Sequence, residues 1–485
     1  MIPQVEKVLT RIPLYVLVGG SLALLTISAL IYATFGLTNF TPLDLAATTL
    51  VFGITTIVIS YALGRLYGIY THLQSSLITA LILTLLFTPT LDGFALLQYA
   101  IIATIAAASK FVIAPYGRHL FNPAAFGAFM GGILGLSFAS WWIASPTFIA
   151  LVVLTSFAVL YKTRQLALGG LFIGVAASIL IVSGLIRGEP ALQVVWIVFV
   201  SWPLIFLAGF MLSEPLTLPP RRQQRLALAV LVACIVALPF HIGDFFNSSP
   251  AFALLVGNIF ALAVAWRQRK GIQLTLTARR KLTATADEYV FSSSRPLSFL
   301  PGQYIELSLP HAMADIRGTR RTFSITSQPG EDELRLGIRF RKSGSTFKQA
   351  LRELPLKSTI QTTGINGDFT LPSRGDSKLL FIAGGIGITP FISHIQSLSD
   401  PSRVTLLYFN RKPGDIPYQT LLDASGAKVY YFTDIPLTQE ILAKHTKNLA
   451  SYEVFISGPP ATVATAKQLI GKQAKSIHTD YFSGY

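Results

Sequence analysis

Three short motifs stand out in the second part of the sequence, and the first of them has residue types and spacing suited to holding a phosphate. The stretch LLFIAGGIGITPFISHI, Leu379 to Ile395, runs from an apolar strand through glycines into a helix, an arrangement that presents backbone N–H groups to phosphate. RTFSITS, Arg321 to Ser327, offers a guanidinium for bidentate pairing with a phosphate oxygen pair. SGPP, Ser457 to Pro460, is a tight turn. Each motif alone also fits an ordinary strand or turn.

The surrounding sequence predicts the elements that must position these motifs. Short alternating strand segments separated by turn residues indicate a small antiparallel β-barrel at 271–373. Its predicted strands are IQLTLTARRKL, EYVFSS, QYIELSLP, TFSITS, ELRLGIRF and TIQTTGI. Apolar strands that alternate with helices then indicate a doubly wound α/β domain at 376–485, whose ligands lie at the carboxyl ends of the strands. Its predicted strands are KLLFIAG, RVTLLYFN, KVYYFTD and YEVFISG, with helices near 390–398, 417–423, 438–445 and 460–473.

Taken in this order, with a barrel before an α/β domain, the three motifs resemble those of the ferredoxin–NADP reductase family over about residues 271–485. The resemblance implies that the barrel binds FAD and the α/β domain binds NAD(P)H. In RTFS it implies that Arg321, beside Thr322, pairs with the FAD pyrophosphate. It also implies that Phe323 packs on the flavin and that the Ser324 hydroxyl hydrogen-bonds the N5 edge of the ring.

A second candidate phosphate contact follows the barrel strand ELRLGIRF. In SGSTFKQAL, Gly344, Ser345 and Thr346 begin a predicted helix, and a helix N terminus favours phosphate. The alternative interpretation of the same residues is a plain Ser/Thr helix cap.

On the NAD(P)H side the resemblance implies contacts from two turns, one that lets the nucleotide approach the backbone closely and one that borders the nicotinamide. These residues are Gly384, Gly385, Gly387, Thr389 and Pro390 in the first turn, and Ser457, Gly458 and Pro459 in the second. The family commonly has Cys where Ser457 stands, so a hydroxyl would line the hydride path here. This departure leaves the rate of hydride transfer open.

The tail HTDYFSGY resembles the end of many family members, where an acid–x–aromatic pattern lies beside the flavin. Asp480 and Phe482 fit that pattern, and Phe482 or Tyr485 would cover the isoalloxazine. The alternative is an ordinary final strand. The predicted catalytic residues are therefore Ser324, Ser457 and Asp480, while nothing in the sequence distinguishes NADH from NADPH.

The first part of the chain has a different composition. Residues 1–270 contain only 14 of the 39 Lys and Arg residues and 6 of the 23 Asp and Glu residues. Ten apolar segments near the length that spans a bilayer lie at about 13–35, 45–64, 74–88, 93–114, 123–142, 147–161, 166–186, 192–212, 226–240 and 251–266. We therefore predict an α-helical polytopic membrane domain of about ten spans at 1–266.

The basic residues of this part predict its orientation. With a cytoplasmic N terminus, every Lys and Arg before residue 271 lies on the cytoplasmic side except Arg187, which is a strong positive-inside pattern. The protein is therefore predicted to be a multi-pass cell (inner) membrane protein with its N terminus and its reductase domain in the cytoplasm. The basic balance then belongs to loops beside the lipid bilayer and not to nucleic-acid binding. The single cysteine, Cys234, excludes a four-cysteine iron–sulfur cluster supplied by this chain.

Similar segments recur five spans apart. FTPTLDG ends the third predicted span and LSEPLTLPP ends the eighth, while FNPAAFGAFMGG opens the fifth and FNSSPAFALLVG opens the tenth. A five-span offset places the two copies on opposite membrane faces, as an inverted 5+5 repeat requires. The alternative is that Pro is simply common at helix ends in membrane proteins.

GRHLFNPAAFG, Gly117 to Gly127, and FMLSEPLTLPP, Phe210 to Pro220, resemble motifs of a family of membrane flavoproteins. Its members are the D component of the Rnf complex and the B component of the sodium-pumping NADH:quinone reductase, Nqr. The resemblance covers roughly residues 40–266 and implies a ten-span membrane flavoprotein. That family carries FMN joined to a threonine on the outer side, after the fifth span. This chain has ASPTF there, so Thr147 is the candidate attachment residue, and the missing Gly-Ala of the family leaves open whether FMN is covalently attached.

A non-covalent flavin, FMN or riboflavin, is a separate expectation. Broken backbone at membrane depth faces a cavity or other protein, because lipid cannot satisfy its N–H and C=O groups. Asn122 offers a donor and an acceptor, Thr217 a hydroxyl, and Glu214 is a rare acid at membrane depth. We predict that these three residues bind the second flavin. Asn122 has the alternative role of a helix cap.

The function predicted from these motifs is a membrane-bound NAD(P)H-oxidising flavoprotein. It would pass electrons from FAD to a redox centre in the membrane domain and on to a quinone or a trans-membrane acceptor, directly or through a partner redox protein. One alternative is a haem enzyme like ferric reductases and NADPH oxidases, but its haems need paired histidines, and this part has only His72, His119 and His241, all near span ends. The other alternative is a transporter with a reductase-derived regulatory domain, which the complete flavin motifs argue against.

Overall fold

The computed structural model describes residues 12–69, 71–115, 118–243, 246–269, 271–311, 314–315, 318–340, 344–372, 377–446 and 448–481. The chain divides into two compact units, with Ile12–Arg267 in one and Gln268–Tyr485 in the other. Each unit is described by itself below.

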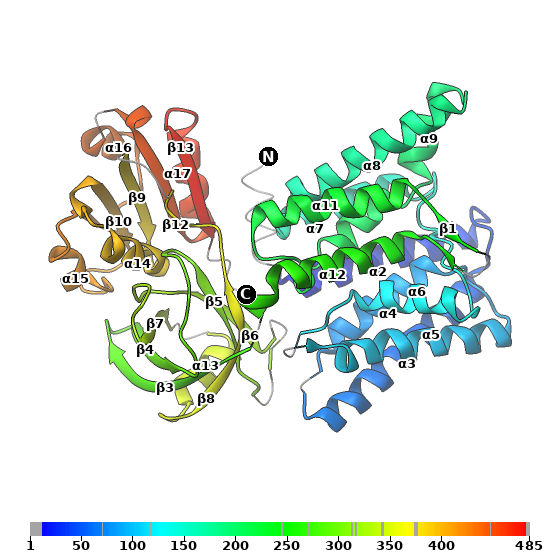
Figure 1. Cartoon of the computed structure of the whole chain (residues 1–485), viewed down its shortest axis with the longest axis horizontal. Coiled ribbons are helices and arrows are strands. Elements are labelled where there is room, and N and C mark those ends of the chain that lie inside the picture. Colours follow the sequence, from blue (N-terminus) through cyan, green and yellow to red (C-terminus); the bar gives the residue numbers. More distant parts are fainter. Residues whose placement is uncertain are drawn as a thin grey trace. The chain divides into compact units, whose positions relative to one another are not determined.

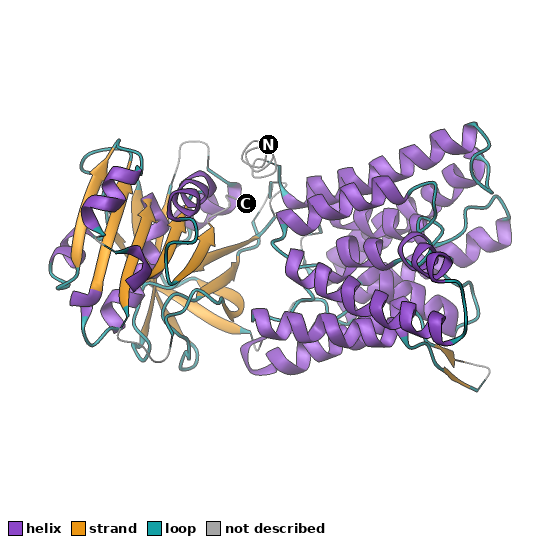
Figure 2. Ribbon diagram, turned by 90° about the horizontal axis from the view of Figure 1, so that it is seen from above, coloured by secondary structure: helices purple, strands orange, loops and turns teal. Residues whose placement is uncertain are grey.

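In its described residues the first unit consists of helices and one short hairpin, and its long helices lie alongside one another (Figures 1 and 2). The helices are α2 (Leu14–Thr34), α3 (Pro42–Tyr67), α4 (Leu73–Leu86), α5 (Gly93–Val112), α6 (Pro123–Ile133), α7 (Ile149–Lys162), α8 (Leu166–Ile186), α9 (Ala191–Val200), α10 (Leu204–Phe206), the π-helix η2 (Leu207–Leu212), α11 (Arg222–Ala237) and α12 (Pro250–Arg269). The hairpin pairs β1 (His241–Ile242) with β2 (Phe246–Asn247).

Each of the ten apolar segments predicted from the sequence contains helix. In the described part of the chain, five helical segments are long and apolar enough to cross a membrane, namely α2, α3, α5, α8 and the stretch Ala191–Leu212. Helices α4, α6, α7 and the apolar part of α12 are shorter. The finding is compatible with membrane insertion, while the number of ten spans and the cytoplasmic orientation stay predictions.

Two of the predicted spans are interrupted. The fifth, expected to run to residue 142, ends as a helix at Ile133, because the chain turns at Gly135 with a φ of 64°. The eighth breaks at Ser201–Pro203, where Pro203 has no N–H to continue the helix, and resumes as α10 and the wider-turned η2. Such π turns within helices often mark functional positions.

Small residues let these helices approach closely. A Cβ on Gly127 of α6 would lie 2.7 Å from the Ala106 side chain of α5, and one on Gly209 of η2 would lie 2.5 Å from Ser156 of α7. Helices α3 to α6 contact one another, and α7, α8, α11 and η2 form a second group of contacts. These two groups correspond to the two halves of the predicted repeat, which itself stays a prediction.

The break after α4 is closed by side chains from several helices. The Thr90 N–H donates to the hydroxyl of Thr48, and the Tyr99 hydroxyl donates to the carbonyl oxygen of Thr88. The indole N–H of Trp142 donates to the carbonyl oxygens of Thr84 and Phe87. Backbone groups that leave the helix at this break are therefore hydrogen-bonded within the unit.

The second unit begins with the predicted antiparallel sheet, whose strand order is β6-β5-β8-β3-β4-β7. The strands are β3 (Ile272–Lys281), β4 (Ala286–Ser293), β5 (Tyr304–Ser308), β6 (Arg320–Ser324), β7 (Glu333–Arg339) and β8 (Thr359–Asn366), with helix α13 (Thr346–Glu353) between β7 and β8. A bridge between Ile325 and Leu336 joins the two edge strands, so the sheet curls into a barrel. Its core contains alternating residues such as Leu274, Ile305 and Leu336.

A parallel sheet of five strands follows, in the order β11-β10-β9-β12-β13. The strands are β9 (Lys378–Gly384), β10 (Val404–Asn410), β11 (Lys428–Thr433), β12 (Tyr452–Gly458) and β13 (Ser476–Tyr481), and the helices are α14 (Thr389–Ser397), α15 (Gln419–Asp423), α16 (Gln439–His445) and α17 (Pro460–Ile470). The four strands predicted by sequence are present, and the tail supplies the fifth.

The two faces of this sheet bury different residues. Phe381 of β9 packs with Phe391 of α14 on one face, while the neighbouring residue Ile382 belongs to the apolar core with Leu442 of α16 and Val463 of α17 on the other. Helices therefore cover both faces, as in doubly wound folds, and the loops that follow β9 and β12 lie together at one edge.

Candidate functional site

The predicted phosphate-binding residues of the barrel meet at one carboxylate. Asp315, in the loop before β6, accepts the N–H of Thr346 at 3.2 Å through Oδ2. Its other oxygen, Oδ1, lies 3.4 Å from Nη2 of Arg321. The Asp315 N–H in turn donates to the Thr346 hydroxyl at 3.0 Å. Segments that are 31 residues apart in sequence are thereby held together at the N terminus of α13.

The Arg321 side chain is buried. Its guanidinium lies 5.4 Å from the centre of the Phe347 ring and donates to the carbonyl oxygen of Gly318 at 3.0 Å. Ser345 caps α13, since its hydroxyl accepts the Lys348 N–H. The cap that was the alternative interpretation of Ser345 is therefore present, while the adjacent Thr346 N–H still points at an anionic group.

The rest of RTFS lies along β6. Phe323 is in the barrel core, and its ring centre lies 6.1 Å from that of Phe347, so most of its surface is already covered. Ser324 is buried and pairs with Tyr304 of β5, while Thr322 pairs with Glu306 on the same strand. The structure thus gives Phe323 a packing role, and its predicted flavin contact stays a prediction.

These donors fit a pyrophosphate. A guanidinium and a backbone N–H at a helix N terminus converge on one carboxylate, and the same pair of donors suits a phosphate. The fit rests on the chemistry of the donors at Asp315. Gly344 directly precedes Ser345, the residue that caps α13, and its predicted phosphate contact stays a prediction.

The two glycine-containing turns of the parallel sheet are in contact. A Cβ on Gly387 would lie 2.5 Å from the carbonyl oxygen of Ser457, and one on Gly458 would lie 3.1 Å from the backbone of Gly384. A Cβ on Gly384 would meet Pro459 at 3.0 Å. Because β9 and β12 are neighbours in the sheet, the turns that follow them lie side by side. A side chain at these glycines would collide with the opposite turn, so the close approach of the two backbones requires glycine.

The first turn leads into α14. Gly385 has a φ of 56°, which favours glycine, and begins a short 3-10 turn before Thr389. The Thr389 hydroxyl donates to the carbonyl oxygen of Ile386, and Pro390 occupies the first turn of the helix. Among the described residues, a Cβ on Gly385 would meet Arg339, at 2.9 Å from Nη1, so a cation lies beside this turn.

Arg339 comes from the barrel and ties it to the parallel sheet. Its Nη2 lies 3.3 Å from Oδ2 of Asp415, in the loop after β10, and Asp415 also accepts hydrogen bonds from the hydroxyls of Thr283 and Thr285. Although burial opposes ionisation, these hydrogen bonds and the Arg339 charge hold the pKa of Asp415 below its usual value. Asp415 is thus a charged tie between two barrel segments and the sheet.

Ser457 and Asp480 are directly paired in register on β12 and β13. Ser457 is fully buried, and its hydroxyl has no hydrogen-bond partner among the described residues. Burial raises the pKa of Asp480 to about 6. Two of the predicted catalytic residues therefore lie together at the carboxyl edge of the sheet, whereas Phe482 and Tyr485 lie outside the described residues.

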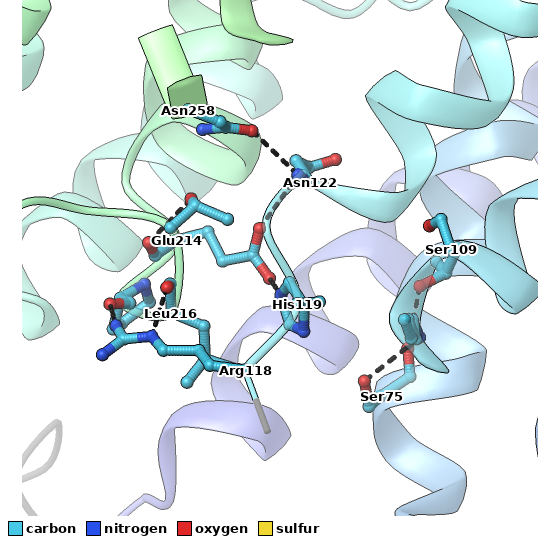
Figure 3. A network of polar contacts seen from close by, with 12 residues as sticks. Ser75, Ser109, Arg118, His119, Asn122, Glu214, Leu216 and Asn258 are labelled. Carbon is cyan, nitrogen blue, oxygen red and sulfur yellow. Dashed lines mark hydrogen bonds and ion pairs between the residues drawn. The ribbon is translucent and has the colours of Figure 1, made fainter. Parts of the chain in front are cut away.

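In the helical unit, Glu214 joins the motifs GRHLFNPAAFG and FMLSEPLTLPP (Figure 3). Its Oε2 accepts the side-chain N–H of Asn122 at 2.9 Å, and its Oε1 lies 2.9 Å from Nε2 of His119. Asn122 also caps α6 by accepting the Ala125 N–H. The predicted pair of Asn122 and Glu214 is therefore in direct contact, and the cap is present as well.

Further contacts surround this cluster (Figure 3). The Asn122 N–H donates to the side-chain oxygen of Asn258 on α12 at 2.9 Å. Arg118 donates to the carbonyl oxygens of Pro215 and Leu216. Thr217 is buried, and its hydroxyl donates to the Glu214 carbonyl oxygen at 3.2 Å, so it supports the turn.

Thr147 is separate from that cluster. It is exposed in the turn before α7, and the adjacent Phe148 contacts Tyr32 near the end of α2. Asn122 begins α6, while Thr147 follows the loop that leaves the other end of the same helix. The structure therefore does not bring Thr147 together with Asn122, Thr217 and Glu214.

Several contacts were not predicted from the sequence. Asp315, Arg339 and Asp415 lie in loops or at strand ends, where a charged residue is usually just solvated. His119 was noted only as a histidine near a span end, although it stands three residues before Asn122 in GRHLFNPAAFG. That proximity was the one signal that could have placed His119 in the cluster.

Comparison with known proteins identifies similarity to reductases. No family model matches the chain. It is 31% identical over 137 residues to methane monooxygenase component C from Methylosinus trichosporium, covering 26% of this chain and 39% of that protein. It is 23% identical over 231 residues to the ferredoxin–NAD(P)+ reductase component of naphthalene 1,2-dioxygenase/salicylate 5-hydroxylase systems from Ralstonia, covering 43% of this chain and 68% of that protein.

A solved structure matches a similar share of the chain. The FAD/NAD-binding domain of nitric oxide dioxygenase from Vibrio cholerae aligns with a TM-score of 0.39 and 18% identity, covering 43% of this chain and 98% of that one. The chain spans about two fifths of the length of methane monooxygenase component C. The chain is thus similar to oxygenase-system components that include a ferredoxin–NAD(P)+ reductase.

Replacing Arg321 with Ala should weaken FAD binding by about 2–4 kcal/mol, roughly 30- to 1000-fold, because a buried charge-assisted contact to the pyrophosphate is lost. FAD retained after dilution of the purified protein measures this loss. Arg320→Ala, one residue earlier on the same strand, is the matched control and should keep its FAD. Full FAD occupancy in Arg321→Ala would show that the motif has another role.

Asp480→Asn should change how stability depends on pH. The pKa of Asp480 is raised from 3.8 to about 6, so its ionisation destabilises the folded state increasingly between about pH 4 and pH 6. The free energy of unfolding of the variant, relative to that of the parent, should therefore be roughly 1–3 kcal/mol higher at pH 7.5 than at pH 4. Urea unfolding of both proteins at the two pH values measures the gain, and an equal difference at both would contradict it.

Proposed function

We propose that the chain is a membrane-bound NAD(P)H-dependent flavin oxidoreductase that feeds electrons into its helical unit. The observation that supports this most is the pairing of two sites in one compact unit. Arg321 and the Thr346 N–H converge on one anionic position in the barrel, and the glycine turns after β9 and β12 pack together at the edge of the parallel sheet. The similarity to reductase components supports the same activity.

FAD would be held by the barrel. Arg321 and the Thr346 N–H would bind its pyrophosphate, and Ser324 would donate a hydrogen bond to the ring. FAD bound there supplies a ring that accepts a hydride and releases electrons singly. When Arg321 and the Thr346 N–H bind the pyrophosphate, the Asp315 carboxylate would lose its contacts with both groups, because the pyrophosphate replaces it as their anionic partner.

NAD(P)H would bind at the turns of the parallel sheet. Gly384, Gly385 and Gly387 would admit the dinucleotide to the backbone, with Thr389 and Pro390 opening the helix behind it. Ser457, Gly458 and Pro459 would border the nicotinamide. The Ser457 hydroxyl, which has no hydrogen-bond partner among the described residues, would then gain an acceptor, and the raised pKa of about 6 would let Asp480 beside it hold a proton at mildly acidic pH.

The helical unit would carry the electrons onward. A second flavin, FMN or riboflavin, would lie against Asn122 and Glu214, where both side chains offer polar atoms at a helix break. The electrons would leave for a quinone, an acceptor across the membrane or a partner redox protein. Ten spans in an inverted 5+5 arrangement, with the reductase unit in the cytoplasm, complete this proposal. Attachment through Thr147 is not part of it.

The reductase activity is tested with residues 271–485 expressed alone. This fragment holds both sheets and their cores, so it should fold, bind FAD and bleach it on addition of NADH or NADPH. Absorbance near the flavin maximum measures the bleaching. A folded fragment that binds FAD but is reduced by neither nucleotide would favour the alternative of a regulatory domain attached to a transporter.

The second flavin is tested by counting acid-released flavin per chain. The full-length protein should hold more flavin than the 271–485 fragment, and Asn122→Leu should lower the surplus because the donor to Glu214 is lost. Asn122→Ser is the matched control for folding: its hydroxyl can still cap α6 but does not replace the amide. If Asn122→Leu loses the flavin surplus and Asn122→Ser keeps it, the role of Asn122 is to cap α6. If the full-length parent and the 271–485 fragment hold equal flavin, there is no second flavin, and direct reduction of a quinone by FAD remains.

A further inference from the structure

Two titratable side chains face each other in the helical unit, and neither is needed to fold a helix. Nε2 of His119, in the segment between α5 and α6, lies 2.9 Å from Oε1 of Glu214, which follows η2. The side chains are 11% and 21% exposed, so both are largely buried yet still reachable from outside. An imidazole and a carboxylate at this distance share a proton.

The carboxylate is oriented by neutral neighbours. Its second oxygen, Oε2, accepts the amide N–H of Asn122 at 2.9 Å, and Asn122 is itself fixed by Asn258 and by the cap of α6. Glu214 is therefore held in one position by a donor that carries no charge. The position of the proton between His119 and Glu214 is not fixed by these neighbours.

The other charged groups near the pair are engaged with backbone. Arg118 donates to the carbonyl oxygens of Pro215 and Leu216. Nζ of Lys110, on α5, donates to the carbonyl oxygen and the hydroxyl of Ser75, and its charge acts on Glu214 across space. The positive charges of Arg118 and Lys110 are therefore each held by hydrogen bonds to neighbouring segments, and His119 is the side chain in contact with Oε1 of Glu214.

We propose that His119 and Glu214 form a proton-transfer pair for the aromatic two-electron acceptor of the helical unit, whether this is a flavin or a quinone. The inference rests on the proposed function. Reduction of such a ring takes up two electrons and two protons, and the overall reaction is NAD(P)H + H⁺ + Q → NAD(P)⁺ + QH₂. His119 delivers one of these protons to the ring and regains it from solvent, while Glu214 stabilises the protonated imidazole; the second proton comes from water.

The test compares acceptors in the full-length protein. NAD(P)H oxidation is measured across the range from mildly acidic to mildly alkaline pH with a water-soluble benzoquinone, which takes up protons, and with ferricyanide, which takes up electrons alone. His119→Gln, which keeps a side-chain N–H but cannot carry a proton, should slow quinone reduction by at least about tenfold and flatten its pH profile. Ferricyanide reduction and FAD content should be unchanged, which also shows that the variant is folded.

Arg118→Gln is the matched control, because it weakens the tie between the same two loops while both members of the pair stay in the chain. It should keep the parent's pH profile. The same loss in Arg118→Gln as in His119→Gln, or a parent-like rate and profile in His119→Gln, would overturn the proposal and give the pair a structural role. A parent protein that reduces ferricyanide but never the quinone or a second flavin would overturn the proposed function, and the pair's role with it.

Absorbance of the bound flavin identifies the ring that is served. If the flavin surplus of His119→Gln is reduced slowly by NAD(P)H, the pair protonates the flavin. If that surplus is reduced as fast as in the parent and only the quinone step slows, the pair protonates the quinone. Both outcomes support proton transfer by His119 and Glu214.

Discussion

Backbone groups that leave a helix inside an apolar unit must find hydrogen-bond partners, because neither lipid nor an apolar side chain offers one. The helical unit meets this constraint with side chains brought from distant helices. Thr48, Tyr99 and Trp142 bond the break after α4, while Arg118 bonds the carbonyl oxygens beside Glu214. These polar side chains thus lie at breaks between helices, and that is where the chemistry is proposed.

The same cluster has a cost that favours a functional interpretation. Arg118, His119, Asn122 and Glu214 occupy an otherwise apolar unit, where polar groups are expensive unless they are paired. Capping α6 requires only the Asn122 side-chain oxygen, and closing the loop requires only Arg118. Neither capping α6 nor closing the loop requires the contact between Glu214 and His119. A transporter would also use such a pair, so the electron acceptors chosen for the test matter.

Much of the fold follows from local sequence. The alternation in ELRLGIRF and the apolar run KLLFIAG predict β7 and β9 because side-chain period and burial are local properties. The contact of Gly387 with Ser457 was predictable only as a shared nucleotide site, since its 2.5 Å approach depends on β9 and β12 being neighbours. The length of α6 was overestimated because the turn at Gly135 lies within an unbroken apolar stretch.

The candidate sites were predicted less completely. RTFS predicts Arg321, but Asp315 lies in a loop whose sequence carries no recognisable pattern, and only the fold brings it to the N terminus of α13. Glu214 was singled out as an acid at membrane depth, yet its partner His119 is 95 residues away in sequence. Pairing across such separations is decided by helix packing, which single-sequence reasoning does not supply.

The tie at Asp415 has a consequence for the reductase unit as a whole. Arg339 belongs to β7 of the barrel, Thr283 and Thr285 precede β4, and Asp415 follows the second strand of the parallel sheet. One carboxylate therefore couples the stability of two sheets that have separate cores. Loss of the contacts to Asp415 would therefore weaken the coupling between the barrel and the nucleotide turns of the parallel sheet.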